Sequence, residues 1–162
     1  MRRSAGVLLF RRAAANASPE LLLVHMGGPF WKNKDVGGWS IPKGELEDGE
    51  EALPVALREF EEELGSPLPP VELIELGEVR QPSGKRIIVF AGEADFDVNN
   101  VRSNTFTIEW PRGSGKQQEF PEIDRAAWVS TEEARLKLVT GQIEFVDRLL
   151  DLLRDNGAAQ TD

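Results

Sequence analysis

Short apolar runs alternate with polar, glycine-rich connections along the chain, and these runs predict most of its strands. Ser4 to Arg11 and Glu20 to His25 contain the runs VLLF and LLLV, which are typical of strands. A turn at residues 82–84 is expected to join the next two strands. The later strands are predicted at Val71–Gln81, Lys85–Asp95, Ser103–Trp110 and Asp124–Val129.

A stripe of apolar residues marks a helix in the middle of the chain. The stripe repeats at i, i+4, i+7 and i+11, so its members are expected to face the core: Leu53, Leu57, Phe60 and Leu64. Pro54 must lie in the first helical turn, because further along it would remove a backbone hydrogen bond. We therefore expect regular helix from about Glu51 or Ala52.

Two further helices are predicted near the C-terminus. Ser130 and Glu133 form a capping-box pattern that starts a helix near Thr131. Gln142 to Arg154 is the last helix, with apolar residues at Ile143, Val146, Leu149, Leu150 and Leu153. The alternation of strands and helices predicts an α/β fold layered around a mixed sheet. We expect a single domain over residues 1–155 and a flexible C-terminal tail over residues 156–162.

Composition and charge narrow the class of protein. Acidic residues outnumber basic residues 28 to 19 among 162 residues, which gives a formal charge of −9 and argues against a stable nucleic-acid partner. The absence of cysteine excludes disulfides and thiol chemistry. The longest aliphatic runs are too short to span a membrane, and no signal-like segment follows Arg2 and Arg3. A cytoplasmic protein with no membrane partner is the default expectation.

The central helix also carries an unusual concentration of carboxylates. Glu59, Glu62 and Glu63 lie at i, i+3 and i+4, on a different face from the apolar stripe. Two carboxylates 4 Å apart repel by about 1 kcal/mol in water and by about 4 kcal/mol at an effective dielectric constant of 20. A divalent cation would turn this repulsion into attraction, and hard oxygen ligands favour Mg²⁺, Mn²⁺ or Ca²⁺. The alternative is an ordinary acidic surface helix.

The residues around these carboxylates resemble a family signature. Gly44 to Ser66 reads GELEDGEEALPVALREFEEELGS, which is similar to the Nudix box, G-x5-E-x7-R-E-U-x-E-E-x-G-U, where U is a bulky apolar residue. Ser66 is the one departure. The matching residues are Gly44, Glu50, Arg58, Glu59, Phe60, Glu62, Glu63 and Gly65. The resemblance implies a Nudix α/β/α sandwich in which the box forms a loop–helix–loop.

The resemblance also implies chemistry. Nudix enzymes use Mg²⁺, for which Mn²⁺ is a possible substitute, to hydrolyse a nucleoside diphosphate linked to another group. Glu59 and Glu63 are then the best metal ligands, with Glu62 beside them and the Gly44 carbonyl as a further ligand. Arg58 would orient the carboxylates.

Two roles are open for Glu50. In the first, Glu50 holds Arg58 or reaches the metal through water. In the second, it is simply a carboxylate favoured by the N-terminal end of the helix dipole.

The general base is expected from a later loop or from the box itself. Glu122 stands six residues before Trp128, and nucleotide-cleaning and diadenosine-polyphosphate Nudix enzymes look similar in having a glutamate at this distance from a tryptophan. Glu122 is therefore the leading additional ligand or base, and Glu119 is the alternative. The opposing interpretation is that both are solvated loop acids.

Substrate recognition is indicated by the segment Trp39-Ser40-Ile41-Pro42-Lys43-Gly44. It resembles the W-x-x-P-K-G segment of enzymes that act on dinucleoside polyphosphates and related nucleotides. Lys43 is predicted to bind phosphate. Trp39, Trp31 or Phe30 are candidates to stack on a base, although packing is an alternative for each of them.

Two other features are given no function. Residues 112–116, RGSGK, do not match a phosphate-binding P-loop and are interpreted as a surface turn, with phosphate contact as the alternative. His25, the only histidine, receives no catalytic task.

The best prediction is thus a Mg²⁺-dependent pyrophosphohydrolase whose small-molecule substrate is a nucleotide, with a dinucleoside polyphosphate as the first choice. Nucleoside triphosphates, oxidised nucleotides, ADP-ribose, capped RNA ends and inositol pyrophosphates are alternatives. A nucleotide-binding regulatory module of the same fold without turnover is a further hypothesis. Such modules usually lose box carboxylates, whereas this chain retains all of them.

Overall fold

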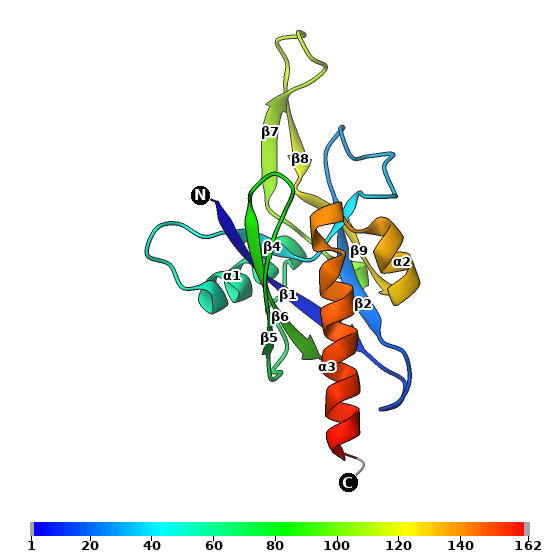
Figure 1. Ribbon diagram of the computed structural model, residues 1–162. Coiled ribbons are helices and arrows are strands. Elements are labelled where there is room, and N and C mark those ends of the chain that lie inside the picture. Colours follow the sequence, from blue (N-terminus) through cyan, green and yellow to red (C-terminus); the bar gives the residue numbers. More distant parts are fainter. Residues whose placement is uncertain (1, 161–162) are drawn as a thin grey trace.

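A mixed sheet forms the middle layer of the protein in this computed structural model, which describes residues 2–160 (Figure 1). The order along the main path is β3-β2-β1-β6-β5, while β4 pairs with β1 and β9 pairs with β2. β1 and β6 are parallel, and the other pairs are antiparallel. The strands are β1 (Arg3–Arg11), β2 (Glu20–Met26), β3 (Trp39–Ser40), β4 (Lys43–Glu45), β5 (Ile74–Arg80), β6 (Arg86–Glu93) and β9 (Ile123–Ser130).

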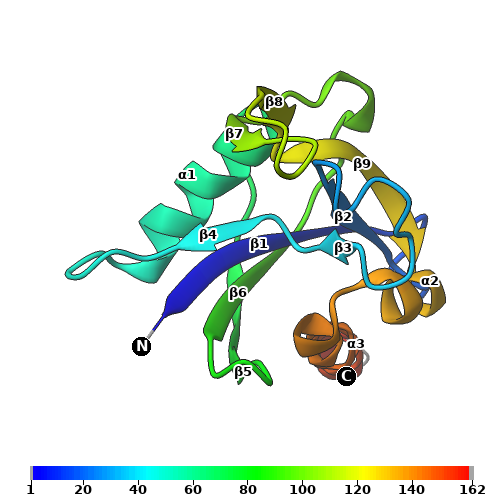
Figure 2. The same ribbon diagram turned by 90° about the horizontal axis from the view of Figure 1, so that it is seen from above.

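Helices cover both faces of this sheet, as the view from above shows (Figure 2). On one face lies α1 (Ala52–Leu64), and on the other lies α3 (Glu144–Gln160) with α2 (Thr131–Lys137) beside it. Short 3₁₀ turns, η1 (Val98–Asn100) and η2 (Thr140–Gln142), complete the connections. The predicted α/β/α sandwich is confirmed.

The run in β1 is continuously apolar because its two faces fill two separate cores. Ala5, Val7 and Leu9 pack in the cluster that contains the buried residues of α1. Leu8 and Phe10 pack in the cluster that contains the buried residues of α3. Side chains alternate across a strand, so a central strand covered on both sides needs apolar residues at every position. None of the described helices is long and apolar enough to cross a membrane.

Most predicted elements are present, with some differences at their ends. α1 begins at Ala52, and Ser130 and Glu133 form both hydrogen bonds of the capping box at the start of α2. α3 extends to Gln160, so the helix is longer than the sequence predicted, and Thr161 and Asp162 lie outside the described residues. The extent of the domain and a flexible tail from residue 156 stay predictions.

The prediction that the apolar stripe of α1 faces the core is wrong for two of its four residues. Leu53 and Leu57 are 40% and 38% exposed. Phe60 and Leu64 are buried as predicted, while Val55, Ala56 and Glu63 are buried in place of Leu53 and Leu57, so the inward face of the helix is rotated relative to the predicted stripe. The rotation places Glu63 on the buried face, where it accepts a hydrogen bond from the Lys43 N–H instead of packing against apolar side chains.

The chain also contains strands that the sequence did not predict. β4 pairs with the start of β1, and β8 (Gln117–Pro121) pairs with β7 (Thr105–Glu109) in a separate two-stranded sheet. β8 is rich in polar residues, four of its five positions being exposed, so no apolar alternation marks it. We call residues 105–121, the hairpin that projects from the body in Figure 1, the arm.

Candidate active site

The glycines at the two ends of the box segment each have a structural reason. Gly44 lies in β4, opposite Ala5 of β1, and a Cβ atom there would lie 1.9 Å from Cδ of Glu59. Only glycine therefore leaves room for the Glu59 side chain against the strand. Gly65 ends α1 with φ 80°, a left-handed conformation, and its N–H donates to the Glu61 carbonyl.

Arg58 lies among three carboxylates of the box. Its Nη1 donates to Glu50 Oε2 over 2.8 Å, and its guanidinium lies 3.8 Å from Glu59 Oε1 and 4.0 Å from Glu62 Oε1. Glu50 also accepts a hydrogen bond from the Glu47 N–H over 2.8 Å, so it closes the loop before the helix. Of the two roles open for Glu50, the structure shows the contact with Arg58.

Glu63 is a buried carboxyl at the junction of α1 and β4. It is 8% exposed, and its Oε1 accepts a hydrogen bond from the Lys43 N–H over 3.1 Å. Burial raises the pKa of Glu63 to about 8, against the opposing effects of the Lys43 charge and N–H group. One backbone N–H is too little to stabilise a buried carboxylate ion. The ionised form of Glu63 is therefore unfavourable unless further positive charge is bound beside it.

Glu59 and Glu122 share this electrostatic environment. Burial and the charge of Glu62 raise the pKa of each of them, while the charge of Lys43 lowers it. Glu59 and Glu122 also raise the pKa of Glu63. Glu122, which follows β8, therefore lies within electrostatic reach of the box glutamates, although about 60 residues separate them in the chain.

Backbone hydrogen bonds fix Glu122 beside the end of α1. The Asn104 N–H donates to the Glu62 carbonyl over 3.1 Å, and the Glu122 N–H donates to the Asn104 carbonyl over 2.9 Å. The Gly27 N–H then donates to the Glu122 carbonyl over 2.7 Å. Asn104 could not be predicted from the sequence, since contacts made by its backbone leave no signature in residue type.

The donor set has the chemistry of a site for a hard divalent cation. In the part of the chain that the structure describes, no three acidic or histidine side chains are placed so that they could already hold a metal ion together. The carboxyls of Glu59, Glu63 and Glu122 nevertheless repel one another, and Lys43 is the cation that offsets this repulsion in all three cases. Oxygen ligands with surplus negative charge fit Mg²⁺ or Mn²⁺.

The residues predicted to bind substrate have different environments. Trp39 is 3% exposed and packs in the α3-side core, so the prediction that it stacks on a ligand is wrong. Its indole N–H donates to Asp35 Oδ1, and the rings of Trp39 and His25 meet edge to face. Trp31 is half-buried in the loop that follows β2, with Lys34 Nζ 5.0 Å from its ring centre. Its role in binding stays a prediction.

His25 is a buried structural residue. Its Nδ1 lies 2.9 Å from Asp124 Oδ1, and its Nε2 lies 2.8 Å from the Lys34 carbonyl oxygen. These contacts tie the loop after β2 to β9, which agrees with the absence of a catalytic assignment.

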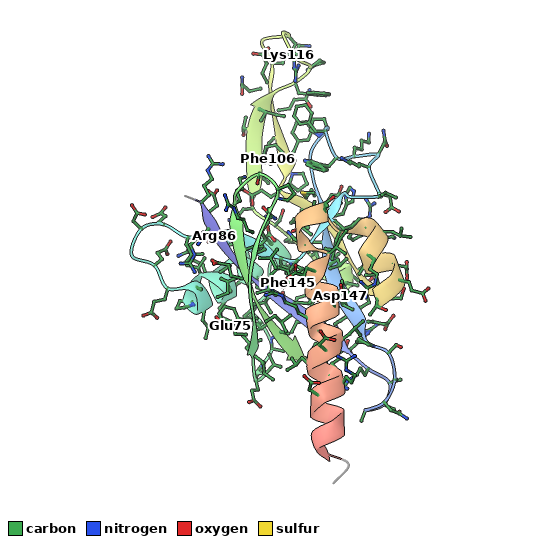
Figure 3. The ribbon with its side chains drawn as sticks, viewed as in Figure 1. Glu75, Arg86, Phe106, Lys116, Phe145 and Asp147 are labelled. Atoms are coloured by element: carbon green, nitrogen blue, oxygen red, sulfur yellow. The ribbon has the colours of Figure 1, made fainter. Side chains whose placement is uncertain are left out.

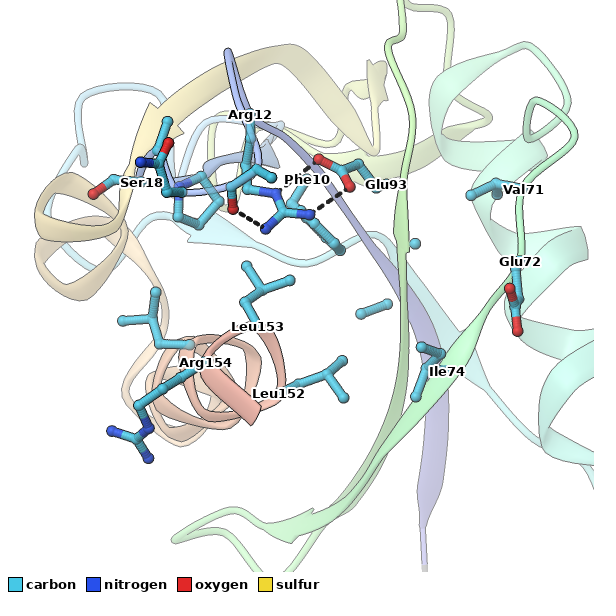
Figure 4. A pocket seen from close by; sticks show the side chains of 17 residues that line it. Phe10, Arg12, Ser18, Val71, Glu72, Ile74, Glu93, Leu152, Leu153 and Arg154 are labelled. Carbon is cyan, nitrogen blue, oxygen red and sulfur yellow. Dashed lines mark hydrogen bonds and ion pairs between the residues drawn. The ribbon is translucent and has the colours of Figure 1, made fainter. Parts of the chain in front are cut away.

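A large cavity lies elsewhere in the molecule. It has a volume of about 900 Å³ and is bounded by Leu152 and Leu153 of α3, by Ile74, and by the ion pair of Arg12 with Glu93 (Figure 4). It contains none of the predicted site residues. The carboxylate cluster is therefore separate from this cavity.

Comparison with known proteins agrees with the box resemblance. Residues 1–149 match the family model described as NUDIX domain. Nudix hydrolase 5 of Arabidopsis thaliana is 29% identical over 119 residues, which are 73% of this chain and 34% of that protein. The chain thus spans about a third of the length of this relative.

Solved structures share the fold. A C. elegans Ap4A hydrolase in a binary complex superposes with a TM-score of 0.65 at 18% identity, covering 96% of this chain and 99% of that one. A mutT/nudix family protein from Listeria innocua gives a TM-score of 0.63 at 18% identity, covering 97% and 96%. At these identities the likeness concerns the fold alone.

Proposed function

The chain belongs to the NUDIX domain family, as its residue pattern predicted, and on this premise we propose that it hydrolyses a phosphoanhydride bond in a nucleoside diphosphate linked to another group. One observation carries the proposal. Carboxyls from α1 and from the segment after β8 lie within electrostatic reach of one another and of the Lys43 charge, and the pKa of each of Glu59, Glu63 and Glu122 is raised. Such groups in one place are typical of a functional site rather than of a solvated helix face.

Four residues would hold the metal. Glu59 and Glu63 are the principal ligands, with Glu62 and the Gly44 carbonyl beside them. When bound, Mg²⁺ or Mn²⁺ supplies charge neutralisation for the phosphates and lowers the pKa of a coordinated water molecule. Arg58 keeps the carboxylates in place through its contacts with Glu50, Glu59 and Glu62.

The remaining groups act on water and on phosphate. Glu122, a further ligand or the general base, accepts a proton as the water oxygen forms a bond to phosphorus and the bridging P–O bond breaks. Burial and the charge of Glu62 raise the pKa of Glu122, which makes this carboxylate a better base near neutral pH. Lys43 places its ammonium group near the carboxylates and would bind a phosphate oxygen.

A dinucleoside polyphosphate such as diadenosine tetraphosphate is the proposed substrate class. The support is the segment Trp39 to Gly44, which resembles that of enzymes acting on these compounds. The C. elegans protein with the same fold is an Ap4A hydrolase by name, which makes this class a sensible first choice.

A panel of nucleotides with Mg²⁺ tests the proposal. Diadenosine tetraphosphate, nucleoside triphosphates, oxidised nucleotides and ADP-ribose are each incubated with the protein in H₂¹⁸O, and the products are identified by mass spectrometry. We expect labelled phosphate products from at least one substrate, the dinucleoside polyphosphate first.

Two variants of α1 make the panel specific. Glu63→Gln should abolish turnover, whereas Glu61→Gln, an exposed glutamate on the same helix, should keep it. Binding of nucleotide without any turnover across the panel would contradict hydrolysis and favour a regulatory module of this fold.

A further inference from the structure

The arm and the loop after β2 form one packed unit at the edge of the carboxylate cluster. The rings of Phe30 and Trp110 meet edge to face with centroids 5.4 Å apart. Gly28 lies so close to Phe106 that a Cβ atom there would be 2.7 Å from its Cζ. Phe106 is labelled at the root of the arm and Lys116 at its tip in Figure 3. The loop therefore supports the arm.

The unit begins at the catalytic carboxylates. β7 starts immediately after Asn104, whose N–H is bound to the Glu62 carbonyl, and β8 ends immediately before Glu122. At about 3.4 Å per residue, the strand from Pro121 to Gln117 is about 14 Å long and leads away from Glu122. A substrate that reaches from the carboxylate cluster to the outer part of this unit would therefore have to be long.

The outer part of the unit is basic in an acidic protein. Residues 27–34 and 110–118 contain four basic residues, Lys32, Lys34, Arg112 and Lys116, and no acidic residue, whereas the whole chain has a charge of −9. Within the described part of the chain, no carboxylate forms an ion pair with any of the four. This charge is complementary to a polyphosphate or nucleotide.

Aromatic rings are exposed among these basic residues. Phe30 is 59% exposed, and Trp31 and Trp110 are partly exposed. Exposed rings next to cations are suited to stacking on a nucleobase while the cations bind phosphate. A fully solvated basic turn would not need three aromatic rings beside it.

We propose that this unit, residues 27–34 together with the arm, is the binding site for the second nucleotide of the substrate, the one that lies beyond the cleaved anhydride. Its base stacks on an exposed ring of Phe30, Trp31 or Trp110, and its phosphates contact Arg112 and Lys116. The proposal rests on the proposed function, because the carboxylate cluster is taken as the place where the anhydride is cleaved. It makes the arm the feature that favours a dinucleotide over a mononucleotide.

Two arm variants test the proposal. Arg112→Ser with Lys116→Ser removes the charge at the exposed tip, and Trp110→Ala removes one ring. The matched control is Arg80→Ser with Lys85→Ser, which removes the same two residue types from the exposed β5–β6 turn, on the other side of the molecule in Figure 2.

Dissociation constants are measured by calorimetry with Mg²⁺, for a methylene-bridged analogue of diadenosine tetraphosphate and for a non-hydrolysable ATP analogue. We expect each arm variant to bind the dinucleotide analogue about tenfold more weakly and the ATP analogue within about twofold of wild type. The charge variant should also lose much of the salt dependence of dinucleotide binding, and the control should bind both as wild type does. In turnover, KM for the dinucleotide should rise while kcat is unchanged.

The outcomes separate the two proposals. Wild-type protein that binds both analogues, with arm variants that bind as wild type or lose both analogues equally, would overturn the role of the arm alone. Wild-type protein that binds neither analogue would overturn the proposed function together with the arm.

Discussion

Replacement of Glu63 by glutamine should change how the stability of the metal-free protein depends on pH. The carboxyl is buried, and its pKa rises from 4.5 to about 8 in the folded protein. A raised folded-state pKa means that the protonated form is favoured by folding. Its contribution to stability is therefore complete below about pH 4.5 and is lost as the pH rises to about 8.

The size of this effect follows from the same shift. A rise from 4.5 to about 8 corresponds, at about 1.36 kcal/mol per pH unit, to on the order of 5 kcal/mol. This is a large share of the roughly 5–15 kcal/mol that stabilises an ordinary domain. Glutamine has the shape of the protonated acid and can accept the same hydrogen bond from the Lys43 N–H, so the variant lacks this pH-dependent loss.

The assay is urea unfolding in EDTA at several pH values between 5 and 9. Wild type should lose stability over this range relative to Glu63→Gln, which becomes the more stable protein at the alkaline end. With Mg²⁺ at about 100 times its dissociation constant, wild type should gain about 2.7 kcal/mol, and the variant much less. Glu61→Gln, on the exposed side of α1, should follow wild type throughout.

Two results would contradict this role of Glu63. Parallel pH profiles of wild type and Glu63→Gln in EDTA would mean that the acid is not buried as described. An equal gain from Mg²⁺ in both proteins would remove Glu63 from the metal ligands.

Further substitutions test individual contacts by steady-state kinetics on the best substrate of the panel. Gly44→Ala places a methyl group 1.9 Å from Cδ of Glu59, so this side chain must move and kcat should fall about 100-fold; a kcat near that of wild type would show that Glu59 tolerates displacement. Glu122→Gln should lower kcat by about 100-fold or more, while Glu119→Gln should leave it unchanged. If Glu122→Gln lowers kcat no more than Glu119→Gln does, the general base is another residue. Arg58→Lys should lower kcat about tenfold with little change in melting temperature, because Arg58 is exposed and its fork of donors orients carboxylates rather than stabilising the fold.

The sequence predicts the layers of this fold well because apolar periodicity reports burial directly. The runs in β1 and β2 and the capping box at Ser130 each depend on a few neighbouring residues, and the structure has all of them. β8 could not be found in this way. It forms by pairing with β7 on a surface, and pairing of backbone groups leaves no apolar pattern.

The same limit applies to the candidate site. The box motif marks Gly44, Arg58 and the glutamates because their spacing on one helix is visible in the chain. The burial of Glu63 is not visible in the sequence, since Leu53 and Leu57 suggest a different inward face, and the face that turns inward depends on packing against distant strands and on the hydrogen bond from the Lys43 N–H. Trp39 was misjudged for a similar reason: the core on the α3 side, which forms from distant segments, covers it.

The most direct test of the central claim is a crystal structure with Mn²⁺ and a non-hydrolysable dinucleotide, in which anomalous scattering locates the metal. We expect an anomalous peak in contact with carboxylate oxygens of Glu59 and Glu63 and with the carbonyl oxygen of Gly44. Bound nucleotide with no metal peak at these oxygens would contradict this claim.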